Sequence, residues 1–406
     1  MASSDLEPGK TFTTAKKIYG ALTHSEVVKA AHILVLCTAF VLETRGHRVL
    51  FYVVALPIFI LSLRELNLRS LGHASIAKLA FAYVAYVLVS GLWTEGLIWT
   101  DMANLLRLAL LVSVFFAITA LLAAGSESFE KRLFVCFALS ASLTLLVVFA
   151  VRIFSGEPDL WRLTGFGLAS HPIIGATLYG SVVLIAAFCL LPQARGMGER
   201  LLWVGVIGLG LCFMMLTASR GPLIALICAL LITTLIADRR IAMIVFGLCT
   251  VGLLGGVLLE LKPIVYLYER APSGHFEIWQ QALQAIAEHP WFGHGSLAEG
   301  GFAGKHGPSR SAHNLLLANQ FYGGIPATLL LVALLGVAAL WAYRAALKGK
   351  PIYLVLLVFG FVASLFDSRS LVQNLGREWV TLWLPFGLLA ARELRDRDSR
   401  GGSVEP

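Results

Sequence analysis

The sequence has 406 residues, of which 58% are hydrophobic and only 14% are charged, and its formal net charge at pH 7 is +8. This composition excludes a soluble globular domain, whose surface needs a larger share of charged side chains. Apolar runs of membrane-spanning length recur along the chain. The sequence therefore predicts an all-α polytopic integral membrane protein.

The polar segment 1–26 is predicted to be a cytoplasmic tail, because it lacks the apolar run and cleavage site of a signal peptide. About twelve transmembrane helices are predicted after it, nine within 27–261 and three within 324–392. A long loop, 262–323, separates the two groups, and 393–406 is predicted to be a C-terminal cytoplasmic tail. The predicted runs are 27–43, 47–63, 74–92, 102–124, 131–154, 171–191, 200–218, 221–237, 241–261, 324–344, 351–366 and 379–392.

An even number of crossings puts both ends of the chain on one side of the membrane. Lysine and arginine favour the cytoplasmic side, and most of the 32 basic residues fall on the side of the chain ends. The loop is therefore predicted to face outward. Arginines on the outer side run against this bias, so each one beside a span needs a reason other than topology.

The loop contains five of the ten histidines. Its segment HFEIWQQALQAIAEHPWFG carries apolar residues at intervals of three and four, which is typical of an amphipathic helix that ends near Pro290 and Gly293. We expect this helix to lie along the membrane surface. Its predicted apolar face consists of Phe276, Trp279, Leu283 and Ile286.

Two arginines near the loop are candidates for anion binding. Arg220, in TASRGPL, lies in a turn too short to hold a loop, so its guanidinium should lie at the outer membrane surface. The Ser-Arg-Gly-Pro setting favours a placed anion-binding arginine, although a side chain that merely snorkels to the interface remains the alternative. Arg270, in YERAPSGH, follows Glu269 and either pairs locally or binds an anion.

His313 and Asn314 lie where the polar loop turns into an apolar helix, at the depth of Arg220. A histidine at such a boundary is either an interfacial residue or a proton acceptor. His289 and His294 are five residues apart with a proline between them, so they do not share a helix face and do not predict a metal site. The sequence also lacks a P-loop, a dinucleotide fingerprint and an outer Asp-x-Asp cluster, so no cofactor and no metal are expected.

The order of these motifs resembles the O-antigen ligase and polymerase superfamily. The shared features are SRG before a late span, an outward loop with W-x-x-A-L and P-x-x-G-x-G, and His-Asn before a Gly-rich helix. They lie within 217–326, and RLTGFGLASHP at 162–172 resembles another stretch of the superfamily. One departure is His275, near which many relatives carry an arginine, and it leaves open whether Arg270 supplies that charge.

The resemblance implies a GT-C-like glycosyltransferase of the bacterial inner membrane with its active site on the periplasmic side. O-antigen ligases transfer a polysaccharide from undecaprenyl diphosphate to a sugar of the lipid A core, and they need neither nucleotide nor metal. The partners implied are therefore the lipid-linked O-antigen, a lipid A-core acceptor and membrane lipids. No nucleic acid is expected.

On this reading Arg220 and Arg270 would hold the diphosphate of the donor, and His313 would accept the proton of the attacking hydroxyl. A single displacement of this kind inverts the anomeric carbon. Further contacts to the substrate are expected from Arg162, His171, His275 and Asn314.

Several alternatives stay open. An O-antigen polymerase uses the same chemistry on a second lipid-linked glycan, and a protein O-oligosaccharyltransferase belongs to the same superfamily. Hydropathy alone also fits a transporter, although the sequence shows no two-half repetition and few acidic residues within its spans. A purely structural membrane scaffold would leave the outer arginines unexplained.

Overall fold

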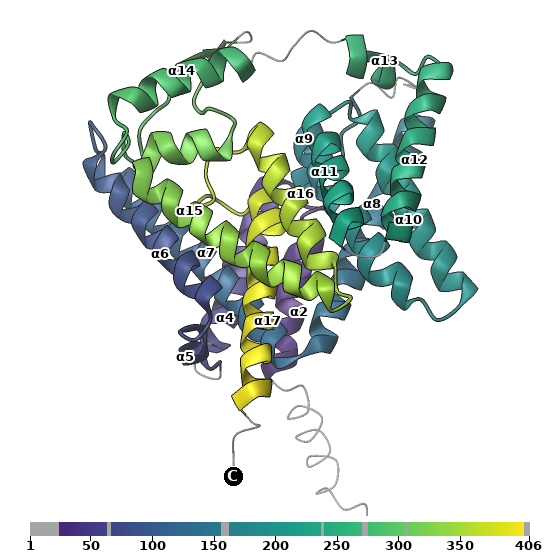
Figure 1. Ribbon diagram of the computed structural model, residues 1–406, viewed down its shortest axis with the longest axis horizontal. Coiled ribbons are helices and arrows are strands. Elements are labelled where there is room, and N and C mark those ends of the chain that lie inside the picture. The colour runs from purple at the N-terminus through teal and green to yellow at the C-terminus, as the bar shows by residue number, and fades with distance from the viewer. Residues whose placement is uncertain are drawn as a thin grey trace, which may run out of the picture.

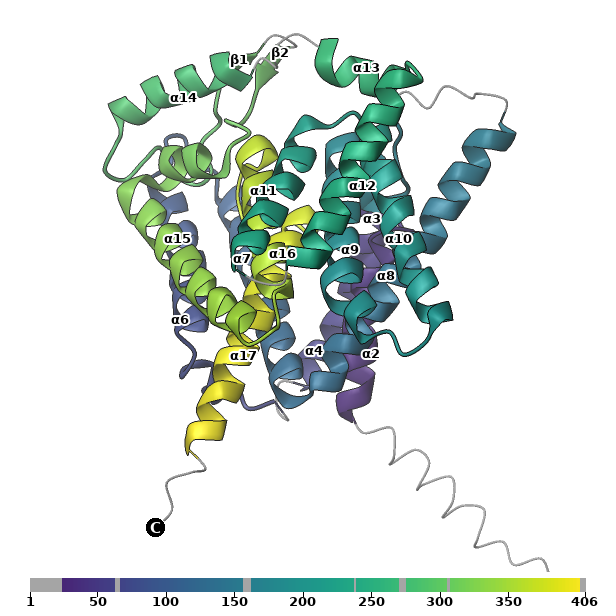
Figure 2. The ribbon, with the colours of Figure 1, turned by 45° about the vertical axis from the view of Figure 1, so that its right-hand side comes forward.

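The structure is a computed structural model, and it describes residues 24–62, 66–155, 162–236, 239–269, 275–304 and 307–401. These residues form a bundle of helices with two further helices lying across one end (Figures 1 and 2). A short antiparallel hairpin of β1 (Phe302–Gly304) and β2 (Gly307–Ser309) is added within the loop. The predicted all-α polytopic architecture is confirmed.

Each predicted apolar run overlaps a helix, but the bounds differ, and some short helices lie outside the runs. Those before the loop are α2 (His24–Thr38), α3 (Thr44–Leu50), α4 (Leu56–Ser62), α5 (Leu68–Leu71), α6 (Ser75–Ser90), α7 (Trp99–Gly125), α8 (Glu127–Phe154), α9 (Pro172–Ile185), α10 (Met197–Leu216), α11 (Arg220–Ile236) and α12 (Arg239–Leu258). Those in and after the loop are α13 (Lys262–Glu269), α14 (His275–Glu288), α15 (Leu315–Leu347), α16 (Ile352–Asp367) and α17 (Leu384–Gly401).

Seven helical stretches of the described chain are long and apolar enough to cross a membrane, and three shorter apolar helices accompany them. Large apolar side chains on the outside of the bundle are exposed, for example Leu143, Leu235 and Val251. Such exposure is expected where the solvent is lipid. The chain is therefore a membrane protein, and the count of twelve crossings remains a prediction.

Ion pairs bring the two described ends of the chain together. Arg132 at the start of α8 lies 2.9 Å from Glu26 of α2, and Arg395 of α17 lies 3.4 Å from Glu127. The loop helices α13 and α14 lie at the opposite end of the bundle (Figure 1). This arrangement agrees with an even number of crossings. The side of the membrane that each end faces remains a prediction.

The segment 368–378, between α16 and α17, is held in place by two tryptophans buried in the bundle. Trp379 and Trp383 are fully buried. The indole nitrogen of Trp383 donates to the carbonyl of Leu371 at 2.8 Å, and that of Trp379 donates to the carbonyl of Gln373 at 3.1 Å. Because the two indoles are immobilised by packing, they hold this segment at one end of the bundle.

Helix α15 begins earlier than the predicted span at 324, because Asn314 caps it. The side-chain oxygen of Asn314 accepts hydrogen bonds from the N–H groups of Leu316 and Leu317. The helix then bends at Gly324, where φ is 65°. At this bend its backbone passes Gly293, on which a Cβ would lie 2.6 Å from the carbonyl oxygen of Phe321. The loop and the helix can approach this closely only because both positions are glycine.

Helix α14 ends before Pro290 as predicted, and of its predicted apolar face Ile286 packs on the rest of the loop. Ile278 and Ala282 are buried, whereas Phe276 and Leu283 are exposed. The buried side joins a small apolar cluster that is separate from the main core, because α14 packs on the hairpin and on the first turns of α15. Its buried members are Ile278, Ala282, Phe302, Ala312, Ala318, Phe321 and Tyr322.

Candidate active site

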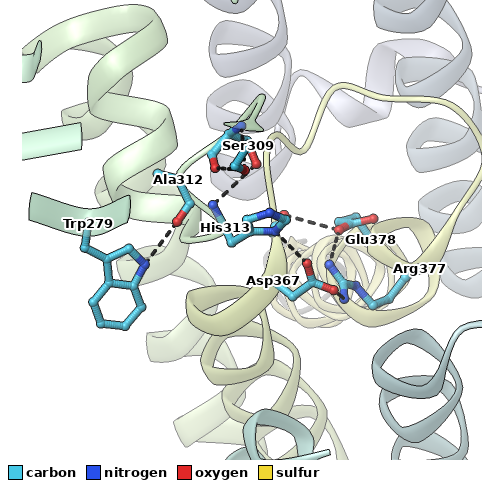
Figure 3. A network of polar contacts seen from close by, with 9 residues as sticks. Trp279, Ser309, Ala312, His313, Asp367, Arg377 and Glu378 are labelled. Carbon is cyan, nitrogen blue, oxygen red and sulfur yellow. Dashed lines mark hydrogen bonds and ion pairs between the residues drawn. The ribbon is translucent and has the colours of Figure 1, made fainter. Parts of the chain in front are cut away.

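His313 is held in an unusual backbone conformation at the end of the loop. Its φ is 48°, a left-handed value that costs a non-glycine residue on the order of 1–3 kcal/mol. The hydroxyl of Ser311 accepts a hydrogen bond from its N–H at 3.3 Å, and the preceding carbonyl, of Ala312, accepts one from the indole of Trp279 at 3.0 Å (Figure 3). These contacts and the cap at Asn314 fix where the imidazole points.

The imidazole contacts a carboxylate from a distant part of the chain. Nδ1 of His313 lies 3.0 Å from Oδ1 of Asp367, the last residue of α16 (Figure 3). Oδ2 of Asp367 accepts a hydrogen bond from Arg377 at 2.9 Å, and Arg377 donates a second one to Glu378 at 2.7 Å. Arg377 is only 6% exposed, so water screens these charges little.

Charge pairing decides the protonation of the carboxylate. Burial alone would raise the pKa of Asp367, but the charge of Arg377 and the hydrogen bond from His313 lower it to about 2. An ionised carboxylate can only accept, so Nδ1 of His313 is the donor. In the neutral ring the lone pair then lies on Nε2, which is the atom able to take a proton from a substrate.

A cavity of about 630 Å³ opens beside this network. That volume lies within the range of small-molecule sites in proteins. Helices α3, α6, α7 and α15 line it together with the segment 367–378. The side chains with polar groups among the lining residues include Thr44, Arg48, Asn104, His171, His313, Asn319, Asp367, Arg369 and Arg377.

The structure gathers several of the residues that the sequence predicted. His171 lines the same cavity as His313, and the ring of His275 lies 5.7 Å from that of His313. Arg162, whose φ is 45°, is not among the residues that line this cavity in the described chain.

The other predicted residues are placed differently. Asn314 is adjacent to His313, but its side-chain oxygen serves as the cap of α15. Arg220 begins α11, and its Nε donates to the carbonyl of Leu267 in α13 at 2.8 Å. In the described part of the chain Arg220 does not line the cavity. Arg270 lies outside the described residues.

Sequence reasoning missed Asp367, Arg377 and Glu378. A signal was present, because both acidic residues stand at the ends of apolar runs, in FDSRS and NLGREW, with arginines beside them. Ionised groups at membrane depth are costly unless they are paired. Opposite charges at the facing ends of two successive spans therefore predict an ion pair between those ends.

Comparison with known proteins identifies the family of the chain. A family model described as O-antigen ligase matches residues 205–332, which include Arg220 and His313 but end before Asp367. Over 302 residues the chain is 31% identical to an O-antigen ligase of Pseudomonas aeruginosa, and the match covers 72% of each chain. The chain belongs to the O-antigen ligase family. The resemblance seen in the motifs is thus confirmed, and membership of the O-antigen ligase family supports a membrane enzyme of the glycosyl-transfer type, a ligase or a polymerase.

Proposed function

We propose that this protein is an O-antigen ligase of the bacterial inner membrane. It transfers a polysaccharide from undecaprenyl diphosphate to a sugar of the lipid A core on the periplasmic side. The observation that carries this proposal is the Asp367–His313 pair at the edge of a cavity, in a chain of this family. A partly buried carboxylate that orients a histidine is an arrangement suited to general-base catalysis.

In the proposed reaction His313 accepts a proton on Nε2 from the acceptor hydroxyl while the hydroxyl oxygen attacks the anomeric carbon of the donor. The bond between that carbon and the diphosphate oxygen breaks, and its electron pair leaves with the diphosphate. Attack from the face opposite to the leaving group inverts the anomeric centre. Asp367 stabilises the positive charge that the imidazole gains.

The leaving diphosphate needs positive charge nearby. Arg220 and Arg270 are proposed to supply it, because the planar guanidinium fork matches phosphate oxygens. Among the described residues no three His, Cys, Asp or Glu side chains come together as a metal site. Fixed arginines are proposed to act in place of a divalent cation. Contacts to the donor sugar are proposed for Arg162, His171, His275 and Asn314.

Transfer by the purified protein tests the proposal. The protein is given lipid-linked O-antigen and lipid A-core in EDTA and without nucleotide. A ligase converts the core into a polysaccharide-bearing product under these conditions. Lengthening of the lipid-linked donor, with no need for core, would instead identify a polymerase. Activity that appears only after Mg²⁺ or Mn²⁺ is added would contradict the metal-independent mechanism.

The orientation in the membrane is tested by cysteine labelling. In a variant whose six native cysteines are replaced, one cysteine is placed at Glu299, between α14 and β1, or at Ser399, near the end of α17. Both residues are exposed. Helix α14 and the end of α17 lie at opposite ends of the bundle (Figure 1). In intact spheroplasts an impermeant maleimide is expected to label position 299, and position 399 only after lysis. The reverse pattern would rule out a periplasmic site.

A further inference from the structure

The cavity beside His313 contains two arginines without a carboxylate partner among the described residues. Arg48 enters from α3 and Arg369 from the segment 368–378. The buried Nε of Arg48 has no hydrogen-bond partner in the described chain. The guanidinium of Arg369 lies 5.3 Å from the centre of the Tyr322 ring. The Arg369 side chain also hydrogen-bonds Tyr322, and because a guanidinium carries five N–H donors, others remain to bind an anion.

The third arginine of the cavity differs from Arg48 and Arg369, because its charge is paired with carboxylates. Arg377 lies between Asp367 and Glu378 and donates to both. The two carboxylates carry two negative charges, and Arg377 neutralises one of them. The remaining negative charge is outnumbered by the two positive charges of Arg48 and Arg369. Arg48 is partly buried and Arg369 is exposed at the cavity. The excess of positive charge makes the lining of this cavity complementary to an anion.

We propose that Arg48 and Arg369 bind phosphate groups of a substrate in this cavity. The inference rests on the proposed function and adds to it, since neither arginine belongs to the SRG turn or to the loop. Guanidinium groups bind phosphate oxygens through paired N–H donors. Two sources share this chemistry: the diphosphate of the lipid-linked donor and phosphate groups carried by the lipid A-core acceptor.

Steady-state kinetics of Arg48→Gln and Arg369→Gln test the proposal. Each variant is assayed with the donor varied at fixed core and with the core varied at fixed donor. Loss of a charge-assisted hydrogen bond is expected to raise KM for one of the substrates by roughly 10- to 100-fold. A rise for the donor identifies the diphosphate as the bound group, and a rise for the acceptor identifies a core phosphate.

Arg45→Gln is the matched control. Arg45 lies on α3 as Arg48 does, but it is exposed and does not line the cavity. Its KM values are expected to equal those of the wild type. If both cavity variants also keep wild-type KM values for donor and acceptor, the inference is wrong. Should Arg48→Gln fail to fold, Arg48→Lys replaces it, because lysine keeps the charge and loses the fork.

A binding measurement separates this inference from the proposed function. Inorganic diphosphate is expected to raise the thermal unfolding midpoint of the wild type and of Arg45→Gln, and to raise that of Arg48→Gln or Arg369→Gln much less. If the wild type shows no transfer at all, the proposed function fails and this measurement alone decides on the anion site. Equal stabilisation of all four proteins, or of none, then counts against it.

Discussion

Replacing His313 with alanine is expected to lower the rate of polysaccharide transfer by roughly 10²–10⁴-fold, the usual contribution of a general base. The imidazole reaches into the cavity and is 38% exposed, so its loss leaves no large void in the core. Protein abundance in the membrane and the affinity for the donor should therefore stay near those of the wild type. Initial rates, measured beside an immunoblot of the membrane fraction, check this prediction.

The control for this experiment is His289→Ala. His289 is another histidine of the loop, but it is exposed, contacts His294 and does not line the cavity. Its removal should leave transfer unchanged. Near-normal transfer by the His313 variant would show that His313 is not the base. The role would then pass to His275, whose ring lies 5.7 Å away.

Asp367→Asn is expected to reduce transfer nearly as much, on the order of 10²–10⁴-fold, although it changes only one atom of the side chain. The amide can turn its NH₂ group toward Nδ1 of His313, and the proton of the imidazole then moves to Nε2, where the lone pair is needed. Donor KM should change little, because the defect lies in proton transfer. A rate within threefold or so of the wild type would show that Asp367 does not set the tautomer.

Glu378→Gln is the matched control for Asp367→Asn. It also removes a carboxylate from Arg377, but this carboxylate does not contact His313. We therefore expect a smaller loss of transfer, and a comparison of the two variants separates pairing of Arg377 from orientation of the imidazole. Melting midpoints of both purified variants show whether loss of a buried charge partner has lowered stability.

The pKa of Asp367 determines how its contribution to stability depends on pH. The pKa of Asp367 is lowered to about 2 in the folded protein, so the stability that its charge contributes is present above the unfolded pKa of about 4 and is lost as pH falls through about 2. Between about pH 5 and pH 8 the carboxylate stays ionised. A change in the wild-type transfer rate over that range would therefore report a group other than Asp367.

The membrane helices and the position of His313 could be predicted from the sequence for physical reasons. Apolar runs report burial in lipid directly, and a histidine at the junction of a polar loop and an apolar run stands at the edge of the bundle. The start of α15 was misplaced because Asn319, Gln320 and the glycines at 323–324 interrupt the apolar run that begins at Leu315. Asparagine is a residue type that commonly caps helices, so Asn314 itself indicated a helix start at this position.

The contact of His313 with Asp367 could not be predicted from the sequence in the same way. Asp367 is 54 residues further along, with the whole of α15 and α16 between them. Their contact depends on how α16 packs beside the end of the loop, which no local pattern encodes. Arg220 illustrates the converse. Its position in a short turn could be read from sequence, but the direction of its side chain is set by Leu267 of α13.

The separate apolar cluster of the loop has a consequence for exchanging parts between related enzymes. Helix α14, the hairpin and the first turns of α15 pack on one another through Ile278, Phe302 and Phe321, apart from the main core. This part of the loop is therefore a packing unit of its own that can be exchanged as a whole with that of a homologue. The graft would carry His313 but not Asp367 or Arg377, which stay with the recipient. A working chimaera thus requires a recipient whose last two spans present a carboxylate at the same place.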